Sequence, residues 1–163
     1  MDTKFNLALR KVKGICDYQF GQEITDILFE DENEIHIIFS RNTGKIKHVY
    51  HNENLLLNLR PTNGFFTLSL ISAERIINNT SSPKLRAVVL NEISDFIRKG
   101  RNVFCKHVVD IDDLLRSNDE VIVVNQRDEL LAIGRLMIPV PYVRSFQTGI
   151  AVKIRKGIIN SKL

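Results

Sequence analysis

Residues 119–135 read DEVIVVNQRDELLAIGR, which is two largely apolar runs on either side of a polar turn. The first run, Asp119–Val124, contains four consecutive aliphatic side chains and has the length of a strand. Asn125–Asp128 has the residue types that favour turns. The second run, Glu129–Arg135, is again of strand length. These residues predict a strand, a turn and a second strand.

Further strands are predicted on both sides of this segment. Val103–Val109 comes before it, followed by an acid-started helical turn at Asp110–Arg116. After it, Met137–Thr148 is interpreted as a loop or bent strand because two prolines interrupt it. Gly149–Arg155 alternates, which places Ile150, Val152 and Ile154 inward and Ala151, Lys153 and Arg155 outward. Short strands of this kind within residues 100–158 predict a compact β-barrel.

The first half of the chain changes from a helical to a strand period. Thr3–Lys13 has apolar residues at helical spacing and is expected to end at Gly14. A short helix is expected after Gly21 and another at Ser72–Asn78. Between them, four strands are predicted at residues 34–39, 45–50, 55–59 and 65–69. Residues 1–82 are therefore predicted to form a small α+β domain with an antiparallel sheet.

The segment that joins the two halves is predicted to be helical. Ser82 suits an N-cap, Pro83 suits the first helical position, and Gly100 is a stop signal. The predicted fold class is thus α+β, with a domain over residues 1–82, a connecting helix over 83–99 and a barrel over 100–158. An apolar stripe follows that helix: Leu85, Val88, Val89, Ile93, Phe96 and Ile97.

Composition limits the cellular context. No apolar run approaches the roughly 20 residues that a bilayer requires, and the N-terminus has no signal-peptide pattern. Cys16 and Cys105 stand alone, which is typical of a reducing compartment. We therefore expect a cytoplasmic protein with no membrane association.

Positive charge gathers in the second half. Residues 1–82 hold 9 Lys and Arg against 10 Asp and Glu, whereas residues 83–163 hold 14 against 9. Such a basic block typically faces a polyanion, because neutralised phosphates release condensed counterions. A solvated basic face without a partner is the alternative. From position 135 onward there are no acids, and the basic residues are Arg135, Arg144, Lys153, Arg155, Lys156 and Lys162.

Patterns for catalysis are weak. The sequence shows no nearby base for Cys16, and Cys105, in a predicted strand beside Phe104, is expected in the core. The four histidines are scattered without metal-ligand spacing. The acids at Asp110, Asp112 and Asp113 are interpreted as a helix-start cluster rather than as paired catalytic carboxylates. Glycines are dispersed and form no phosphate-binding loop. We expect no catalytic residue, no metal and no cofactor.

Four blocks of the second half together resemble the PUA domain, an RNA-binding barrel of pseudouridine synthases and archaeosine transglycosylases. They are KGRNVFCKHVVD (99–110), DEVIVVN (119–125), ELLAIGR (129–135) and TGIAVKIR (148–155). The loop IPVPYV (138–143) departs from the family's usual SGEEM-like sequence.

The first half resembles the domain that precedes the PUA domain in archaeosine tRNA-guanine transglycosylases of archaea. The similarity lies in CDYQFG (16–21), the hairpin SRNTGKIKHVY (40–50) and LRPTNGFFTLS (59–69). No counterpart of the catalytic barrel of these enzymes is found. The resemblance implies a module for tRNA processing and tRNA modification, in archaeosine biosynthesis.

The resemblance and the charge pattern suggest an RNA-binding face. Phe146 is expected either to stack on a base or to lie in the barrel core, and Tyr142 is a similar case. Tyr18, Phe20, Phe65 and Phe66 are expected in the core. The candidate RNA-binding residues are Lys99, Arg101, Lys106, His107, Arg135, Arg144, Phe146, Lys153 and Arg155, with Arg41, Lys45 and Lys47 on a smaller basic hairpin.

Several functions fit these features. The first is a tRNA-binding accessory protein that serves a separate transglycosylase catalytic subunit. The second is a general RNA-binding or ribosome-associated PUA protein. The third is a tRNA-modifying enzyme that acts alone, and the fourth is a scaffold that uses Pro139–Val143 as an apolar contact.

Overall fold

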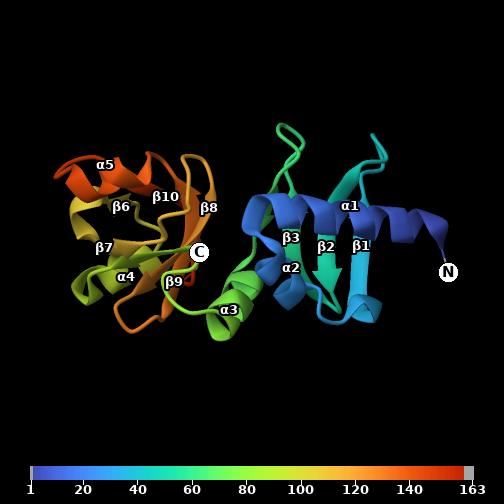
Figure 1. Ribbon diagram of the computed structural model, residues 1–163, viewed down its shortest axis with the longest axis horizontal. Coiled ribbons are helices and arrows are strands. Elements are labelled where there is room, and N and C mark those ends of the chain that lie inside the picture. The colour runs from blue at the N-terminus through green and yellow to red at the C-terminus, as the bar shows by residue number, and fades with distance from the viewer. Residues whose placement is uncertain (1, 160–163) are drawn as a thin grey trace. The chain divides into compact units, whose positions relative to one another are not determined.

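The computed structural model describes residues 2–159, so the basic residue Lys162 lies outside the described part. The chain forms two compact units, one ending at Asn79 and the other beginning at Thr80. We call them the first unit and the second unit (Figure 1). The α+β class expected from the sequence is confirmed, because each unit combines helices with a sheet.

The first unit is an antiparallel sheet with the strand order β1-β2-β3-β4. Figure 1 shows α1 and α2 in front of these strands, and α1 contacts both β1 and β4. The elements are α1 (Thr3–Phe20), α2 (Gln22–Leu28), the 3-10 helix η1 (Glu32–Glu34), β1 (Ile35–Phe39), β2 (Ile46–His51), β3 (Asn54–Leu59), β4 (Phe66–Leu68) and α3 (Leu70–Asn79).

Helix α1 continues through Gly14, so the expected end at that residue is wrong. Val12, Cys16 and Phe20 are all buried and follow one another at four-residue spacing on one helix face. Burial of the residues beyond Gly14 outweighs the cost of about 1 kcal/mol for a glycine inside a helix. The helix ends instead at Gly21, whose φ of 94° favours glycine.

One face of the first unit's sheet forms its core. Cross-strand pairing places Ile37, Val49, Leu57 and Leu68 in one row across all four strands. Val49 and Leu57 have no exposed surface. Paired residues on neighbouring strands point to the same side of a sheet, and the burial of Val49 and Leu57 indicates that this side is the one covered by the helices.

The second unit is a six-stranded sheet with the order β6-β10-β9-β8-β5-β7. Its first and last strands in that order, β6 (Val103–Phe104) and β7 (Val108–Ile111), are joined by the short 3-10 helix η3 (Cys105–His107), so the sheet curls into a nearly closed barrel. The remaining elements are β5 (Arg86–Val89), the 3-10 helix η2 (Asn91–Ile93), α4 (Ser94–Arg98), β8 (Glu120–Asn125), β9 (Leu130–Leu136), α5 (Val140–Ser145) and β10 (Ile150–Gly157).

The expected connecting helix over residues 83–99 is wrong. Its first part is strand β5, which pairs with β8 on one side and β7 on the other. All four β5 residues are buried. A short apolar run fits a buried strand as well as a helix, and partners distant in sequence decide between them. Only α4 and η2 are helical, and they belong to the second unit.

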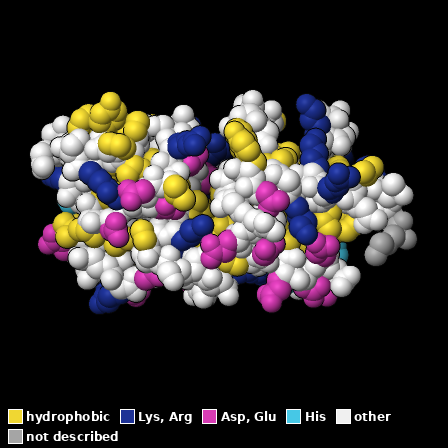
Figure 2. Space-filling view, in the orientation of Figure 1, with side chains coloured by type: hydrophobic (Ala, Val, Ile, Leu, Met, Phe, Trp, Pro, Cys, Tyr) yellow, Lys and Arg dark blue, Asp and Glu magenta, His cyan; other side chains and the backbone are white. Residues whose placement is uncertain are grey.

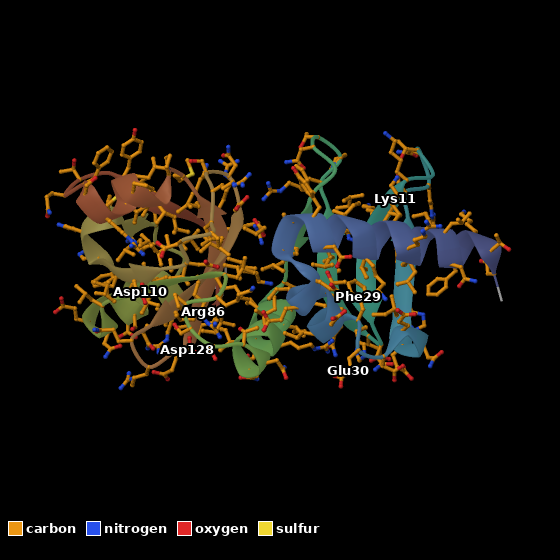
Figure 3. The ribbon with its side chains drawn as sticks, viewed as in Figure 1. Lys11, Phe29, Glu30, Arg86, Asp110 and Asp128 are labelled. Atoms are coloured by element: carbon orange, nitrogen blue, oxygen red, sulfur yellow. The ribbon has the colours of Figure 1, made fainter. Side chains whose placement is uncertain are left out.

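A buried arginine fixes the start of β5. Arg86 is fully buried, and its Nε lies 3.0 Å from Asp128 Oδ1 on the β8–β9 turn (Figure 3). The Arg86 guanidinium also donates to the carbonyl oxygens of Lys84 and Thr80 at 3.1 and 3.2 Å. Burial lowers the pKa of Arg86, and the charge of Asp128 opposes that shift. These contacts tie three parts of the second unit together.

Two expectations near the C-terminus are also corrected. The loop expected over Met137–Thr148 contains helix α5, because Pro141 lies in the first helical turn, where no amide donor is needed. In β10, Ile150 is 38% exposed whereas Ala151 is buried, so the expected alternation is wrong there. Irregularities in the pairing of β10 with β6 and β9 shift the pattern by a residue.

Among the described residues, no helix has the length and apolar character needed to cross a membrane.

Candidate functional site

Two of the candidate arginines are held by carboxylates of their own unit. Arg155 forms a two-pronged ion pair with the buried Glu120, with N–O distances of 2.8 and 2.6 Å. Arg144 lies 2.7 Å from Asp113 Oδ1, and its Nη2 donates to the carbonyl oxygen of Ile111. The two contacts of Arg144 fasten α5 to the end of β7 and to the segment that follows it. Both arginines therefore have a structural role before any ligand binds.

Arg135 and Lys153 are brought together on neighbouring strands. They are paired directly across β9 and β10, and Glu120 is paired with Arg135 on its other side. Like charges directly opposite each other repel. Gly134 makes this close approach possible, because a Cβ atom there would lie 2.3 Å from the backbone oxygen of Lys153. An anion placed at this pair would relieve the repulsion.

Lys99 and Arg101 flank Gly100 at the end of α4. That end is clamped to the end of β10, because Ile159 N donates to the Arg98 carbonyl oxygen at 2.9 Å. Gly157 fits only without a side chain, since a Cβ atom would lie 2.1 Å from the same oxygen. The clamp brings the two candidate cations close to the exposed Lys156, a residue that the candidate set omitted.

Lys106 and His107 lie on η3, which contacts α5. Exposed aromatic side chains accompany them, and Figure 2 shows hydrophobic side chains gathered over α5. Tyr142 and Phe146 are stacked, with ring centroids 5.2 Å apart and an interplanar angle of 15°. They are 51% and 46% exposed, so the core alternative for Phe146 is wrong. Phe104, which is 45% exposed and contacts the His107 ring, belongs to the same group.

The candidate residues Arg41, Lys45 and Lys47 lie in the first unit, on the β1–β2 hairpin, and all three are exposed. The structure therefore divides the candidate set between the two units. In the second unit it forms three groups, at the α4 end, across β9 and β10, and on η3 with α5.

Two aromatic residues expected in the core of the first unit are exposed instead. Tyr18 is 80% and Phe65 38% exposed, and their rings are stacked 5.9 Å apart. The neighbouring Gln19 explains part of the CDYQFG block. Its side-chain amide donates to the Phe66 carbonyl oxygen and accepts from the Phe66 amide, so it caps the free edge of β4. Phe20 and Phe66 are buried, as expected.

The cysteines are poorly suited to nucleophilic chemistry. Cys16 is fully buried, and burial raises the pKa of its thiol to about 12. Burial also raises the pKa of Cys105. The reactive form of a cysteine is the thiolate, which these environments disfavour. Within residues 2–159, no group of three or more His, Cys, Asp or Glu is arranged to hold a metal ion.

Comparison with known families assigns a class to each unit. Residues 86–158 match the PUA domain, and residues 10–83 match the patch-forming domain C2 of tRNA-guanine transglycosylase. The molecule is thus a C2–PUA protein, and the resemblance seen in the sequence is confirmed for both units.

The chain is similar to archaeal tRNA-guanine(15) transglycosylases. It is 43% identical over 150 residues to the tRNA-guanine(15) transglycosylase of Methanobrevibacter smithii, which covers 92% of this chain and 22% of that protein. The same enzyme from Methanothermobacter thermautotrophicus is 40% identical over 149 residues, which are 91% of this chain and again 22% of the relative. The chain therefore spans about a fifth of the length of these relatives.

Solved structures show the same fold at low sequence identity. A hypothetical protein from Pyrococcus horikoshii OT3 superimposes with a TM-score of 0.76 at 18% identity, covering 95% of this chain and 92% of that one. A conserved PUA domain protein from Thermoplasma acidophilum gives a TM-score of 0.61 at 15% identity, covering 91% and 92%.

Proposed function

We propose that this protein binds tRNA through the basic surface of its second unit and serves tRNA modification of the archaeosine type. The catalytic step belongs in this proposal to a separate transglycosylase protein. Support comes from the match of the two units to domain C2 of tRNA-guanine transglycosylase and to the PUA domain, from the similarity to enzymes named tRNA-guanine(15) transglycosylase, and from the poor fit of both cysteines to nucleophilic chemistry.

One observation carries the proposal. Of the nine acidic residues in the second unit, eight bond to groups of that unit, whereas Arg101, Lys106, Lys153 and Lys156 are exposed and form no salt bridge with another described residue. The positive charge is thus left facing solvent, as binding to a phosphate backbone requires. The eight engaged acids are Asp95, Asp110, Asp112, Asp113, Asp119, Glu120, Asp128 and Glu129.

The surface suits a double-helical stem. The deep and narrow major groove of A-form RNA is closed to side chains, so proteins hold such stems by backbone and shape. Lysines on η3, β10 and the α4 end are flexible donors that suit phosphates. The exposed ring pair of Tyr142 and Phe146 beside η3 adds a surface on which an unpaired base can stack.

A salt titration tests the proposal. We expect tRNA to bind in a mobility-shift assay and the logarithm of the association constant to fall linearly with the logarithm of the salt concentration. The slope should be about −0.9 for each phosphate contacted in a duplex. No binding at low salt, or binding that is independent of salt, would contradict it. Competition with ribosomal RNA fragments separates tRNA binding from general RNA binding, since a preference for the fragments contradicts the tRNA assignment.

The accessory role has its own test. The purified chain alone should exchange no guanine into tRNA. Co-purification with a transglycosylase catalytic protein, and a lower KM of that protein for tRNA when the chain is added, are the expected results. Guanine exchange by the chain alone, or an unchanged KM, would show the accessory role to be wrong.

A further inference from the structure

The sheet of the first unit has a second face, opposite the helices. Cross-strand pairing places Ile38, His48, Asn58 and Thr67 in one row across all four strands. A second row runs through His36, Tyr50 and Leu55. We call these two rows the open face.

The part of the open face on β1 and β2 is accessible where the core face is not, whereas Thr67 at its β4 end is buried. The core-facing residues Val49 and Leu57 are fully buried, whereas His36 is exposed and Ile38 is 46% exposed. His48 and Tyr50, on the central strand β2, are half-buried. Helices α1 and α2 lie on the other side of the strands (Figure 1). The open face therefore presents flat side chains on a rigid support.

Its chemistry is aromatic and free of acids. The rings of His48 and Tyr50 lie edge to face with centroids 6.2 Å apart, and the His48 Nδ1–H donates to Asn58 Oδ1. The two ring-bearing positions on β2 are two residues apart, which corresponds to about 6.6 Å along a strand. Neither row contains an Asp or Glu residue. Rings, an amide and an aliphatic patch without negative charge are what unpaired bases require.

Cations border the open face at one end. The β1–β2 hairpin forms a pocket of about 330 Å³ that reaches from Ile38 and His48 of the open face to Arg41 and Lys47 of the hairpin. Lys47 lies at the irregularity in the β1–β2 pairing, between Ile46 and His48, and its side chain is exposed. The pocket thus joins the ring surface to two positive charges, and this combination matches a base with its phosphate.

We propose that the open face binds an unpaired, single-stranded RNA segment, with bases stacked on His36, His48 and Tyr50 and a phosphate held by Arg41 and Lys47. Charge complementarity favours RNA over a protein partner, because the rim is basic and the face lacks acids. The inference rests on the proposed RNA-binding function, but it assigns a surface in the other unit and a different form of RNA. In this assignment, the second unit holds a stem and the first unit holds a single strand.

The test uses the full chain and two RNA probes. A fluorescein-labelled single-stranded hexamer and a fully paired RNA hairpin stem are titrated by fluorescence anisotropy at low salt. Tyr50→Leu keeps an apolar side chain but removes the ring. We expect it to weaken hexamer binding about 5- to 100-fold, as loss of one stacked base does, and to change stem binding less than twofold. Lys47→Gln should weaken hexamer binding and lower its salt slope by about 0.7.

Matched controls decide whether the effect is local. Lys11→Gln removes an exposed cation from α1, on the helix side of the same unit (Figure 3), and should leave hexamer binding unchanged. Tyr18→Leu removes an 80% exposed ring from α1, on the helix side of the same unit, and should also leave hexamer binding unchanged. Circular dichroism of each variant confirms that it is folded.

Three outcomes would overturn the inference. They are stem binding without hexamer binding, equal losses for Lys47→Gln and Lys11→Gln, and loss of hexamer binding with Tyr18→Leu but not with Tyr50→Leu. In each of these the proposed function survives, because RNA is still bound. If the chain bound neither the hexamer nor the stem nor tRNA, both the proposed function and this inference would be wrong.

Discussion

The two units use β-structure in opposite ways. The first unit leaves one sheet face open, and Gln19 covers the edge of β4. The second unit closes its sheet into a barrel, so strands β5 and β8 are buried throughout. An open sheet offers a flat surface made of strand side chains. A closed barrel offers only its rim, its short helices and outward-facing side chains, and its candidate residues lie there.

Closure should also make the second unit depend on its interior ion pair. Arg86→Ala removes a fully buried cation, its ion pair with Asp128 and the two hydrogen bonds that its guanidinium donates to the carbonyl oxygens of Lys84 and Thr80. We expect the free energy of unfolding of the second unit to fall by about 3–5 kcal/mol. Hydrogen exchange should show lost protection in β5 and β8 but not in β2 and β3.

The matched control for Arg86 is Arg127→Ala on the same turn as Asp128. Arg127 is 68% exposed and pairs with Glu129 at 2.8 Å, so we expect a loss below about 1 kcal/mol. Equal losses for the two variants, or lost protection in both units with Arg86→Ala, would contradict the division of the molecule described above.

A smaller effect is expected where the barrel closes on itself. Gly157→Ala places a Cβ atom against the Arg98 carbonyl oxygen and must separate α4 from the end of β10. We expect a loss of about 1–3 kcal/mol, measured by urea denaturation, together with weaker tRNA binding, because Lys99 and Arg101 lose their position. An unchanged free energy of unfolding would show that the contact between α4 and the end of β10 does not contribute to stability.

The smallest effect has the opposite sign and belongs to the first unit. Gly14→Ala is expected to stabilise helix α1 by about 0.5–1 kcal/mol, since nothing lies within 4 Å of the added methyl group. The melting temperatures of Gly14→Ala and Gly157→Ala, measured side by side by thermal unfolding, should shift in opposite directions from that of the wild type. A destabilised Gly14→Ala variant would mean that α1 does not run through this position as described.

Local sequence patterns predicted most strands and the resemblance predicted both domains, but long-range partners decided the rest. Strand β5 was mistaken for a helix because its pairing with β7 and β8 involves residues far along the chain. The ion pairs of Arg144 and Arg155 could not be predicted from the sequence for the same reason, because their partners Asp113 and Glu120 lie 31 and 35 positions earlier. The exposure of Tyr18 depends on tertiary packing, which the spacing of apolar residues in the sequence does not predict.

Binding of tRNA by the exposed cations of the second unit is the central claim. The most direct measurement compares the tRNA dissociation constant of the wild type with that of a triple charge-reversal variant, Arg101→Glu, Lys106→Glu and Lys153→Glu, at one fixed salt concentration. The matched control is Arg127→Glu, an exposed arginine on the β8–β9 turn. We predict a loss of at least tenfold for the triple variant and less than threefold for the control. An unchanged dissociation constant for the triple variant, with its fold intact, would contradict the account.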